Sequence, residues 1–467
     1  ERDRRGGFVR TVYSAAPTGS FPTLLSQAGI FSNLNTLAVH DGILPYTINV
    51  PFWSDAAIKR RWFSVPNTNL VIGFNAEGAW SAPTTTVWIK HFDFLLTSGV
   101  PASARRLETR VLVKNNTGSG GYGVTYRWGT STNDAVLVQT AGLDEALLVN
   151  ESGIIRTQVW RYPSRAECLS CHTPGAGFAL SFNTPQMHID SDLGGGVTGQ
   201  IAALRDADYF AAPPTNLHLL RRLAHATNSA YSVEYRVRSY LQANCAQCHY
   251  PGGPSTGGFD TRVFTSLSNA GLIDGPLNDN GGNPSNRVIV RAFPTNSMLL
   301  HRISFRGGGQ MPPVGSNLVD TQNVALVTAW ITGEAAAYES FAEWQVRHFG
   351  SSALPDAQPD SDPDQDGGDN RHEYLTGTQP TNALEIWGID IVELIDGGPP
   401  AVAFDQIARR GFEVQVSTSL VDAAWQTLDI PENEPVFRAV TQPAIVPDLQ
   451  NTNEVEQRFL RVKVYEP

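Results

Sequence analysis

The segment Cys245-Ala246-Gln247-Cys248-His249 has the same pattern as an earlier segment, Cys168-Leu169-Ser170-Cys171-His172. Two thiols three residues apart on one helical turn can each add to a vinyl group of a haem, and the next residue then places its imidazole beneath the iron. The C-x-x-C-H pattern is therefore typical of c-type haem attachment. The two copies predict two covalently bound haem c groups, with His172 and His249 as iron ligands.

A structural zinc site is the alternative interpretation, because two C-x-x-C pairs can supply four thiolates to one ion. Zinc ribbons usually separate their pairs by about 15 to 20 residues, whereas Cys171 and Cys245 are 74 positions apart (245 − 171). Zinc also gives no reason for a histidine after each pair. The chain has 4 cysteines, and the two motifs use all of them, so none is left for a disulfide.

The composition limits the partners that the chain can have. No stretch approaches the 18 or more apolar residues that a membrane helix needs, so we expect no membrane span. The net charge of −11 argues against nucleic acid and anionic membrane surfaces, because both bind basic patches. A basic redox protein or dehydrogenase is the favoured partner.

Haem is attached to C-x-x-C-H motifs on the outer side of the energy-conserving membrane. We therefore expect a periplasmic or extracellular protein. Since no signal peptide precedes the chain, Glu1 is interpreted as the start of a processed, secreted form.

The 467 residues suffice for about three domains of ordinary size. Strand-like runs rich in β-branched and aromatic residues occur at 87–94, 110–114 and 123–128, separated by Gly, Ser and Asn turns. The prediction is a multidomain chain with four parts: a β-rich domain at 1–160, an α-helical dihaem cytochrome c region at 161–335, a helix and calcium-loop linker at 336–382, and a small C-terminal β-sandwich at 383–467.

The second motif has the more complete helical frame. Ser232 can cap a helix that leads into Cys245, and a further helix is expected to begin after Asp320. Between them, Met311 lies in a Gly-rich and Pro-rich loop that can present its thioether to the iron. This order of elements is that of a class I cytochrome c domain, which we predict for residues 232–333, with Met311 as the second haem's sixth ligand.

The sixth ligand of the first haem is less clear from the sequence. Met187 follows the first motif closely, and His188 stands beside it. His91 is a third candidate, on the predicted strand at 87–94. An open position, or one filled by a partner, is the remaining alternative.

An acidic segment after residue 350 matches the twelve-residue calcium loop at every position. The expected ligands are Asp362, Asp364, Asp366, Gly368 through its carbonyl, Asn370 and Glu373. The alternative is a solvated acidic linker. Because no flanking pair of helices is evident, we expect one calcium-stabilised junction rather than a regulatory EF-hand.

Several longer phrases resemble an exported family of dihaem c-type proteins from environmental bacteria, some of them fused to quinone-dependent sugar dehydrogenases. The matching phrases are 51–61, 90–92, 106–110, 164–172, 244–249 and 310–313. The resemblance covers residues 21 to 333 and implies a β-rich region followed by two haem sites. Residues 334–467 resemble the calcium loop and β domain appended to secreted proteins of planctomycete-like bacteria.

Three functions are compatible with these features. The first is electron transfer between redox partners by an exported dihaem cytochrome. The second is a dihaem peroxidase, an enzyme in which the first haem keeps an open face for hydrogen peroxide. The third is a structural role, in which the β domains join subunits into a homo-oligomeric or polymeric extracellular array.

Overall fold

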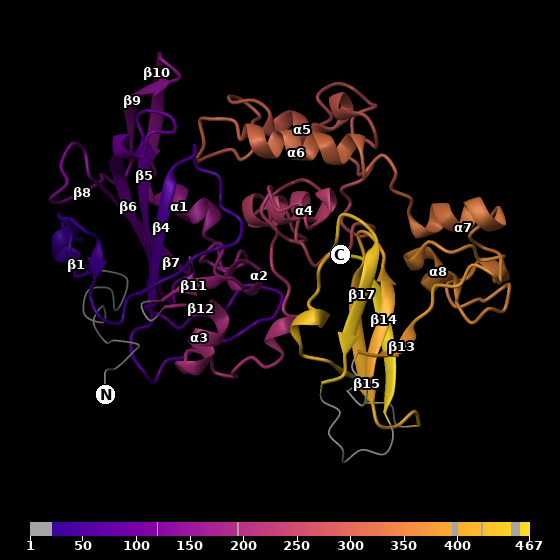
Figure 1. The fold of residues 1–467 in the computed structure, drawn as a ribbon. Coiled ribbons are helices and arrows are strands. Elements are labelled where there is room, and N and C mark those ends of the chain that lie inside the picture. The colour runs from indigo at the N-terminus through magenta and orange to yellow at the C-terminus, as the bar shows by residue number, and fades with distance from the viewer. Residues whose placement is uncertain (1–20, 119, 194–195, 395–399, 422–423, 450–457) are drawn as a thin grey trace. The chain divides into compact units, whose positions relative to one another are not determined.

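The computed structural model describes residues 21–118, 120–193, 196–394, 400–421, 424–449 and 458–467. The chain divides into two compact units, each made of several chain segments (Figure 1). Unit 1 comprises Glu1–Thr215, Tyr240–Gly257 and Leu299–Val324, and unit 2 comprises Asn216–Ser239, Gly258–Met298 and Ala325–Pro467. The predicted dihaem region, 161–335, therefore contributes segments to both units.

A six-stranded antiparallel sheet forms the centre of unit 1, with the strand order β3-β4-β5-β6-β7-β8. The three strands predicted from the sequence are confirmed as parts of β5, β6 and β7. The strands are β3 (Leu44–Pro45), β4 (Ile58–Ser64), β5 (Val87–Leu95), β6 (Ala104–Lys114), β7 (Gly121–Arg127) and β8 (Val136–Leu137).

The two faces of this sheet have different roles. Val87 and Ile89 of β5 pack into a buried apolar core on one face. Successive side chains of a strand point to opposite faces, so Trp88 and Lys90 lie on the other face, where they line a cavity. The sheet thus supplies a core on one side and a cavity wall on the other.

Shorter elements complete unit 1. The hairpin of β9 (Leu143–Glu151) and β10 (Ile154–Tyr162) turns through Ser152 and Gly153, both with positive φ, as a two-residue type I′ turn requires. The remaining elements are η2 (Leu25–Ala28), β1 (Phe31–Asn33), β2 (Ala38–Val39), η3 (Pro101–Ser103), α1 (Arg165–Cys171), α2 (Thr184–Met187), β11 (Asp190–Asp192), β12 (Val197–Gly199) and α3 (Gln200–Asp206).

The predicted α-helical cytochrome c region, including the class I frame at 232–333, is wrong as a fold class. Its described helices are short and are separated by long non-helical segments of chain; residues 251–293, for example, contain no helix. The Gly, Asn and Pro residues of that segment favour turns over helix. The two capped helices do form, as α4 (Val233–Asn244) and α6 (Thr321–Thr332), with α5 (Met298–Ile303) between them. Throughout the described ranges, every helix is too short or too polar to cross a lipid bilayer.

Unit 2 contains two three-stranded sheets that share one core, around Phe404, Phe412 and Val414. The β-rich parts of the prediction agree with this arrangement. One sheet has the order β13-β14-β17 and the other β16-β15-β18. The elements are η4 (Leu217–Leu219), η5 (Pro294–Asn296), α7 (Phe341–Phe349), η6 (Pro355–Ala357), α8 (Asn370–Thr376), β13 (Asp390–Glu393), β14 (Pro400–Gln406), β15 (Gly411–Ser417), β16 (Gln426–Thr427), η7 (Pro431–Asn433), β17 (Gln442–Pro447) and β18 (Phe459–Tyr465).

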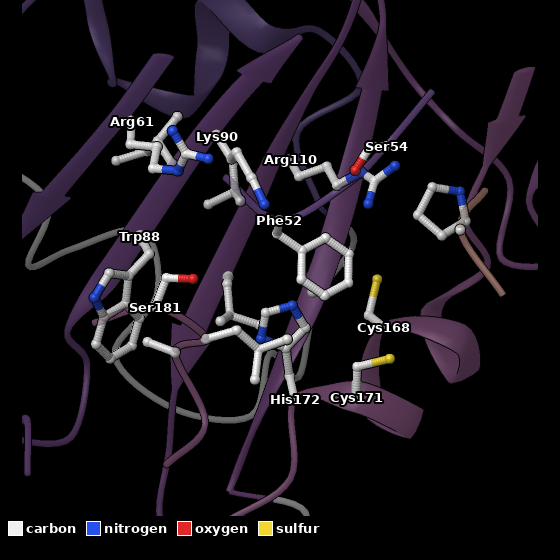
Figure 2. A pocket seen from close by; sticks show the side chains of 18 of the residues that line it. Phe52, Ser54, Arg61, Trp88, Lys90, Arg110, Cys168, Cys171, His172 and Ser181 are labelled. Carbon is white, nitrogen blue, oxygen red and sulfur yellow. The ribbon is translucent and has the colours of Figure 1, made fainter. Parts of the chain in front are cut away.

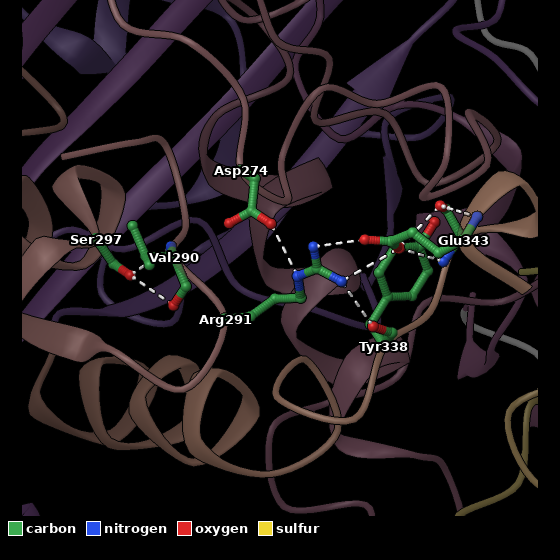
Figure 3. A network of polar contacts seen from close by, with 7 residues as sticks. Asp274, Val290, Arg291, Ser297, Tyr338 and Glu343 are labelled. Atoms are coloured by element: carbon green, nitrogen blue, oxygen red, sulfur yellow. Dashed lines mark hydrogen bonds and ion pairs between the residues drawn. The ribbon is translucent and has the colours of Figure 1, made fainter. Parts of the chain in front are cut away.

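Arg291 joins three segments of unit 2 (Figure 3). Its guanidinium lies 2.8 Å from Asp274 and 2.7 Å from Glu343, and it donates to the carbonyl of Tyr338 at 3.1 Å. The hydrogen bond from Arg291 lowers the pKa of Glu343 to about 2. Glu343 also receives the backbone N–H of Ser340 in the capping box that starts α7, so the network fixes the beginning of that helix.

Candidate haem attachment sites

The first motif lies on helix α1. Ser164 caps this helix: its side chain accepts a hydrogen bond from the backbone N–H of Glu167 at 3.1 Å, and the Glu167 carboxylate accepts from the N–H of Ser164 at 2.6 Å. Both cysteines lie within the helix and His172 terminates it. Figure 2 shows Cys168, Cys171 and His172 grouped along one side of a cavity. The spacing expected for haem attachment is therefore held on a capped helical turn.

The hydrogen bond of His172 sets which ring nitrogen can bind a metal. Nδ1 lies 2.6 Å from the carbonyl oxygen of Phe178. Since a carbonyl can only accept, Nδ1 carries the proton and Nε2 is the nitrogen left for iron. Burial lowers the pKa of His172 to about 4, with further lowering by Lys90 and Arg110. The imidazole is neutral at neutral pH, as an iron ligand must be.

The cavity beside this motif has a volume of about 130 Å³ and opens partly to solvent. Its walls come from the sheet, from α1 and from the segments 179–181 and 314–315. Two thiols and one imidazole line this space, and these are the groups that a covalently attached haem needs.

Two glycines of β7 leave room for the attachment helix. A Cβ atom at Gly123 would lie 3.1 Å from Cys168 Sγ, and one at Gly121 would overlap the ring of Phe178. Glycine within a strand often marks such a close approach of other chain. Gly121 and Gly123 are not among the site residues predicted from the sequence, although their alternation at the start of a predicted strand signals a close approach of other chain.

The second motif directly follows helix α4. The backbone N–H of His249 donates to the carbonyl of Cys245 at 2.9 Å, which continues the helical turn through the motif. The Oγ of Ser255 lies 3.0 Å from His249 Nδ1 and fixes the orientation of the ring. Proximal histidines at metal sites usually have such an Nδ1 partner. The arrangement parallels that of His172, with a hydroxyl in place of a carbonyl.

The four cysteines are not gathered around one point, as a structural zinc site requires. Among the described residues, which include all four cysteines, no set of three thiolates lies close enough to hold one ion. The zinc alternative therefore finds no support.

The two motifs lie near each other within unit 1. Burial raises the pKa of Cys248, and the charge of Cys171 raises it further. A Cβ atom at Gly175, three residues after His172, would overlap the hydroxyl of Tyr250, which follows His249. The chain segments after the two histidines are thus in contact.

The loop that carries Met311 is held by its own hydrogen bonds. The Met311 backbone N–H donates to the carbonyl of Arg302 at 2.8 Å. Gln310 Nε2 donates to the carbonyls of Pro312 and Ser316 at 3.0 and 3.1 Å. The Met311 side chain is half-buried and belongs to unit 1 with His249. Its role as an iron ligand stays a prediction.

Asp55 binds the end of this loop to the β-rich part of unit 1 through two hydrogen bonds. Its Oδ1 accepts hydrogen bonds from the backbone N–H groups of Asn317 and Leu318, each at 2.8 Å. Nearby, the Trp53 N–H donates to the side chain of Asn244, just before the second motif, at 2.7 Å. The segment 53–55, part of the phrase 51–61, thus contacts both the residue before the second motif and the end of the Met311 loop. We did not predict these contacts.

None of the three candidate sixth ligands of the first haem lines its cavity. His91 lies on the opposite face of β5, where Nδ1 is 2.8 Å from Thr109 Oγ1 and Nε2 is 3.1 Å from Asp93 Oδ1. Met187 is buried, and its sulfur accepts from Gln200 Nε2 at 3.3 Å. His188 ends helix α2. These placements do not support any of the three as the ligand.

The acidic loop of unit 2 gathers the predicted calcium ligands. Carboxylate oxygens of Asp362, Asp364 and Asp366 lie within 4.8 Å of one another. Gly367 takes a positive φ of 98°, which gives the sharp turn that the calcium loop needs at this position. Helix α8 begins at Asn370, whereas α7 ends at Phe349, well before the loop. One helix therefore adjoins the loop.

Three oxygens at expected ligand positions are buried without a hydrogen-bond partner: Asp364 Oδ2, Asn370 Oδ1 and Glu373 Oε2. Burial raises the pKa of Glu373 to about 7, and Asp364 and Asp366 raise it further. Such buried acceptors are costly unless they are paired. Their number, chemistry and positions fit a Ca²⁺ ion.

No protein-family model, curated protein or solved structure matches the chain. The resemblance to exported dihaem proteins therefore stays a hypothesis that rests on the sequence phrases. The functional argument depends on the geometry of the two motifs and their surroundings.

Proposed function

We propose that the chain is an exported dihaem c-type cytochrome that carries electrons between redox partners. The observation that carries the proposal is the pair of C-x-x-C-H motifs in one compact unit, each with the Nδ1 of its histidine held by an oxygen. The cavity lined by Cys168, Cys171 and His172 supports it. Haem iron would supply a one-electron couple.

Each residue of the two motifs has a defined part in this proposal. Cys168 and Cys171 anchor one haem, and Cys245 and Cys248 anchor the other. His172 and His249 bind iron, and the oxygens on Nδ1 orient their rings. The segments that follow the two histidines are in contact, and this supports electron transfer between the two haems within the chain.

Met311 is the proposed sixth ligand of the second haem. Methionine ligation raises the potential of a haem relative to two histidines. The hydrogen bonds that hold the loop around Gln310 would keep the thioether in place during turnover. The second haem is then the higher-potential site.

The direct test is to produce the full chain in a host that matures cytochromes c. We expect an intact mass that includes two haems, a c-type pyridine haemochrome spectrum, and two one-electron components in a potentiometric titration. A chain that carries no haem, or one that binds zinc in place of haem, would refute the proposal.

A dihaem peroxidase is the second candidate. The observation in its favour is that the described residues lining the first cavity include no histidine or methionine besides His172. A first haem with an open sixth position would be high-spin in its ferric form and would turn over hydrogen peroxide. Two low-spin, six-coordinate haems would exclude it.

We also propose that Asp362, Asp364, Asp366, Gly368, Asn370 and Glu373 bind one Ca²⁺. The test is calcium titration of the full chain by calorimetry, with Glu373→Gln as the site variant and Asp360→Ala as its control. Asp360 is acidic and exposed but lies outside the loop. We expect at least a tenfold loss of affinity in Glu373→Gln only, because position 12 supplies two of the ligand oxygens. Equal affinity in both variants would refute the site.

The partner is proposed from charge. With a net charge of −11, the chain favours a basic redox protein, whose association would weaken as salt is raised. Export to the periplasm or the cell exterior is proposed because C-x-x-C-H haem attachment takes place there.

A further inference from the structure

Three basic side chains form a row on the cavity face of the sheet. Arg61 of β4 is paired across the strands with Lys90 of β5, and Lys90 is paired with Arg110 of β6. All three line the cavity beside the first motif. Figure 2 shows them on the side of the cavity opposite His172 and the two cysteines.

The charges of this row are not balanced by the protein. Arg110 donates to the buried carboxylate of Glu108 at 2.5 Å. Arg61 and Lys90 form no ion pair with any residue that the structure describes. Lys59, which donates to the carbonyl of Phe52 at 2.7 Å, adds a further positive charge nearby. Arg61 and Lys90 therefore have no carboxylate partner of their own among the described residues of the cavity wall.

A buried row of like charges destabilises the folded chain unless an anion lies beside it. Like charges directly opposite each other in a sheet are destabilising, and burial of an unpaired charge costs more still. Burial lowers the pKa of Lys90 well below its usual value, and Arg61, Lys59 and Arg110 lower it further against the opposing effect of Glu108. Burial, Arg61 and Arg110 likewise lower the pKa of Lys59 to about 7. A ligand with two negative groups would remove this cost.

We propose that Arg61 and Lys90, with Arg110 beside them, bind the two propionate groups of the haem attached at Cys168 and Cys171. The inference rests on the proposed function, since it assigns an orientation to the haem of that site. Two cations without a carboxylate partner match two carboxylates, and Arg is suited to bind a carboxylate through two parallel hydrogen bonds. The row also places positive charge beside the first haem, which favours its ferrous form and raises its potential.

The test uses the full-length haem-loaded protein and the variants Lys90→Gln and Arg61→Gln. Arg60→Gln is the matched control, because Arg60 is one residue away but lies on the opposite face, paired with Asp93 at 3.0 Å. We expect one of the two midpoint potentials to fall by about 59 mV, a tenfold change for a one-electron couple, in Lys90→Gln and Arg61→Gln. The other midpoint should stay unchanged, as should both midpoints in Arg60→Gln.

Resonance Raman spectra supply a readout that does not depend on potential. The propionate bending bands of one haem should shift in Lys90→Gln and return in Lys90→Arg, which restores the charge. Rescue by Lys90→Arg also separates loss of charge from misfolding. Unchanged propionate bands and midpoints in both site variants would overturn the inference, as would an equal shift in Arg60→Gln.

Two other results have distinct meanings. If the wild-type chain carries no haem at the first motif, the proposed function itself fails there. If haem is present but Lys90→Gln converts it from low-spin to high-spin, Lys90 binds iron, and its assignment to a propionate is overturned while the cytochrome function stands.

Discussion

The two C-x-x-C-H motifs have the same chemistry but different surroundings. The first lies on the seven-residue helix α1 and faces a cavity whose far wall is a basic row on a β-sheet. The second follows the twelve-residue helix α4 and is linked through Asn244 and Asp55 to the sheet and to the methionine loop. One site is built mainly by a sheet and the other by a helix and a loop.

This difference separates the properties that depend on the motif from those that depend on residues elsewhere in the chain. In the proposed function, the five residues of each motif would attach one haem and supply one iron ligand. At the first site, the residues that would set the orientation and the potential of a haem come from strands more than 50 positions earlier in the chain. At the second site, the proposed sixth ligand, Met311, comes from a loop 62 positions after His249 (311 − 249). Two haems with equal attachment are therefore expected to differ in potential, and variants can test each site separately.

The largest expected effect comes from removing the thiols of one motif at a time. The Cys168→Ser/Cys171→Ser variant should retain one haem, and the Cys245→Ser/Cys248→Ser variant should retain the other, because no other cysteine is present. Intact mass and the haemochrome spectrum measure the number of haems. Each single-haem chain should keep one of the two midpoints of the wild type.

The hypothesis of two separate attachment sites would be contradicted if either double variant lost both haems or neither haem. Loss of both would mean that the two sites cannot be formed independently. Loss of none would mean that the cysteines are not the attachment points.

The sequence revealed the motifs, the helix caps and the main strands because each depends on residues close together in the chain. It did not predict which side chains face the cavity, because that depends on strand register. His91 was a candidate ligand, but side chains alternate between faces, so the sheet turns Lys90 into the cavity and His91 away from it. The basic row emerges only when β4, β5 and β6 are aligned. The helical fold class was wrong because capping signals mark where helices begin and say little about the long segments between them.

The close contact between β7 and α1 offers a second way to separate the two sites. Gly123→Val adds a side chain that starts 3.1 Å from Cys168 Sγ, and overpacking of this kind typically costs about 1 to 3 kcal/mol. We expect a lower unfolding temperature and reduced occupancy of the first haem, with the second haem unaffected. Gly118→Val is the control, because a Cβ atom there meets open space. Equal losses in the two variants would count against the packing argument.

Strong acid should weaken the support of the first site. Glu145 of β9 binds Arg105, Arg127 and Tyr162, which anchors the end of the hairpin that leads into α1. Burial acts to raise the pKa of Glu145, but these three donors outweigh it and lower the pKa to about 2. A carboxylate with a depressed folded-state pKa stabilises the fold above its ordinary pKa, near 4.5, and loses this contribution as pH falls toward 2.

The variant Glu145→Gln should therefore be less stable than the wild type by about 1 to 2 kcal/mol above pH 5, after allowance for solvent screening. The difference should shrink steadily as pH is lowered toward 2. Denaturant unfolding at several pH values measures it, with Glu151→Gln as control, because Glu151 is exposed and pairs with Arg156 in an exposed contact on the same hairpin. A difference that does not change with pH would contradict the assigned ion pairs.

The smallest expected effect concerns the second site. Asp55→Asn keeps the shape of the side chain that accepts from Asn317 and Leu318, but it replaces charge-assisted hydrogen bonds by neutral ones, a loss of about 1 kcal/mol. It also turns an N–H₂ group toward the Gln158 side chain, which in the wild type donates to Asp55 at 3.2 Å.

The methionine loop should loosen in this variant, so the Met-to-iron absorption band of the second haem should weaken while the first midpoint stays unchanged. Asp206→Asn, on an exposed side chain, should leave both haems as they are. If Asp55→Asn instead changed only the first haem, the link between the segment 53–55 and the second site would have to be abandoned, because the hydrogen bonds of Asp55 would then support the other cavity.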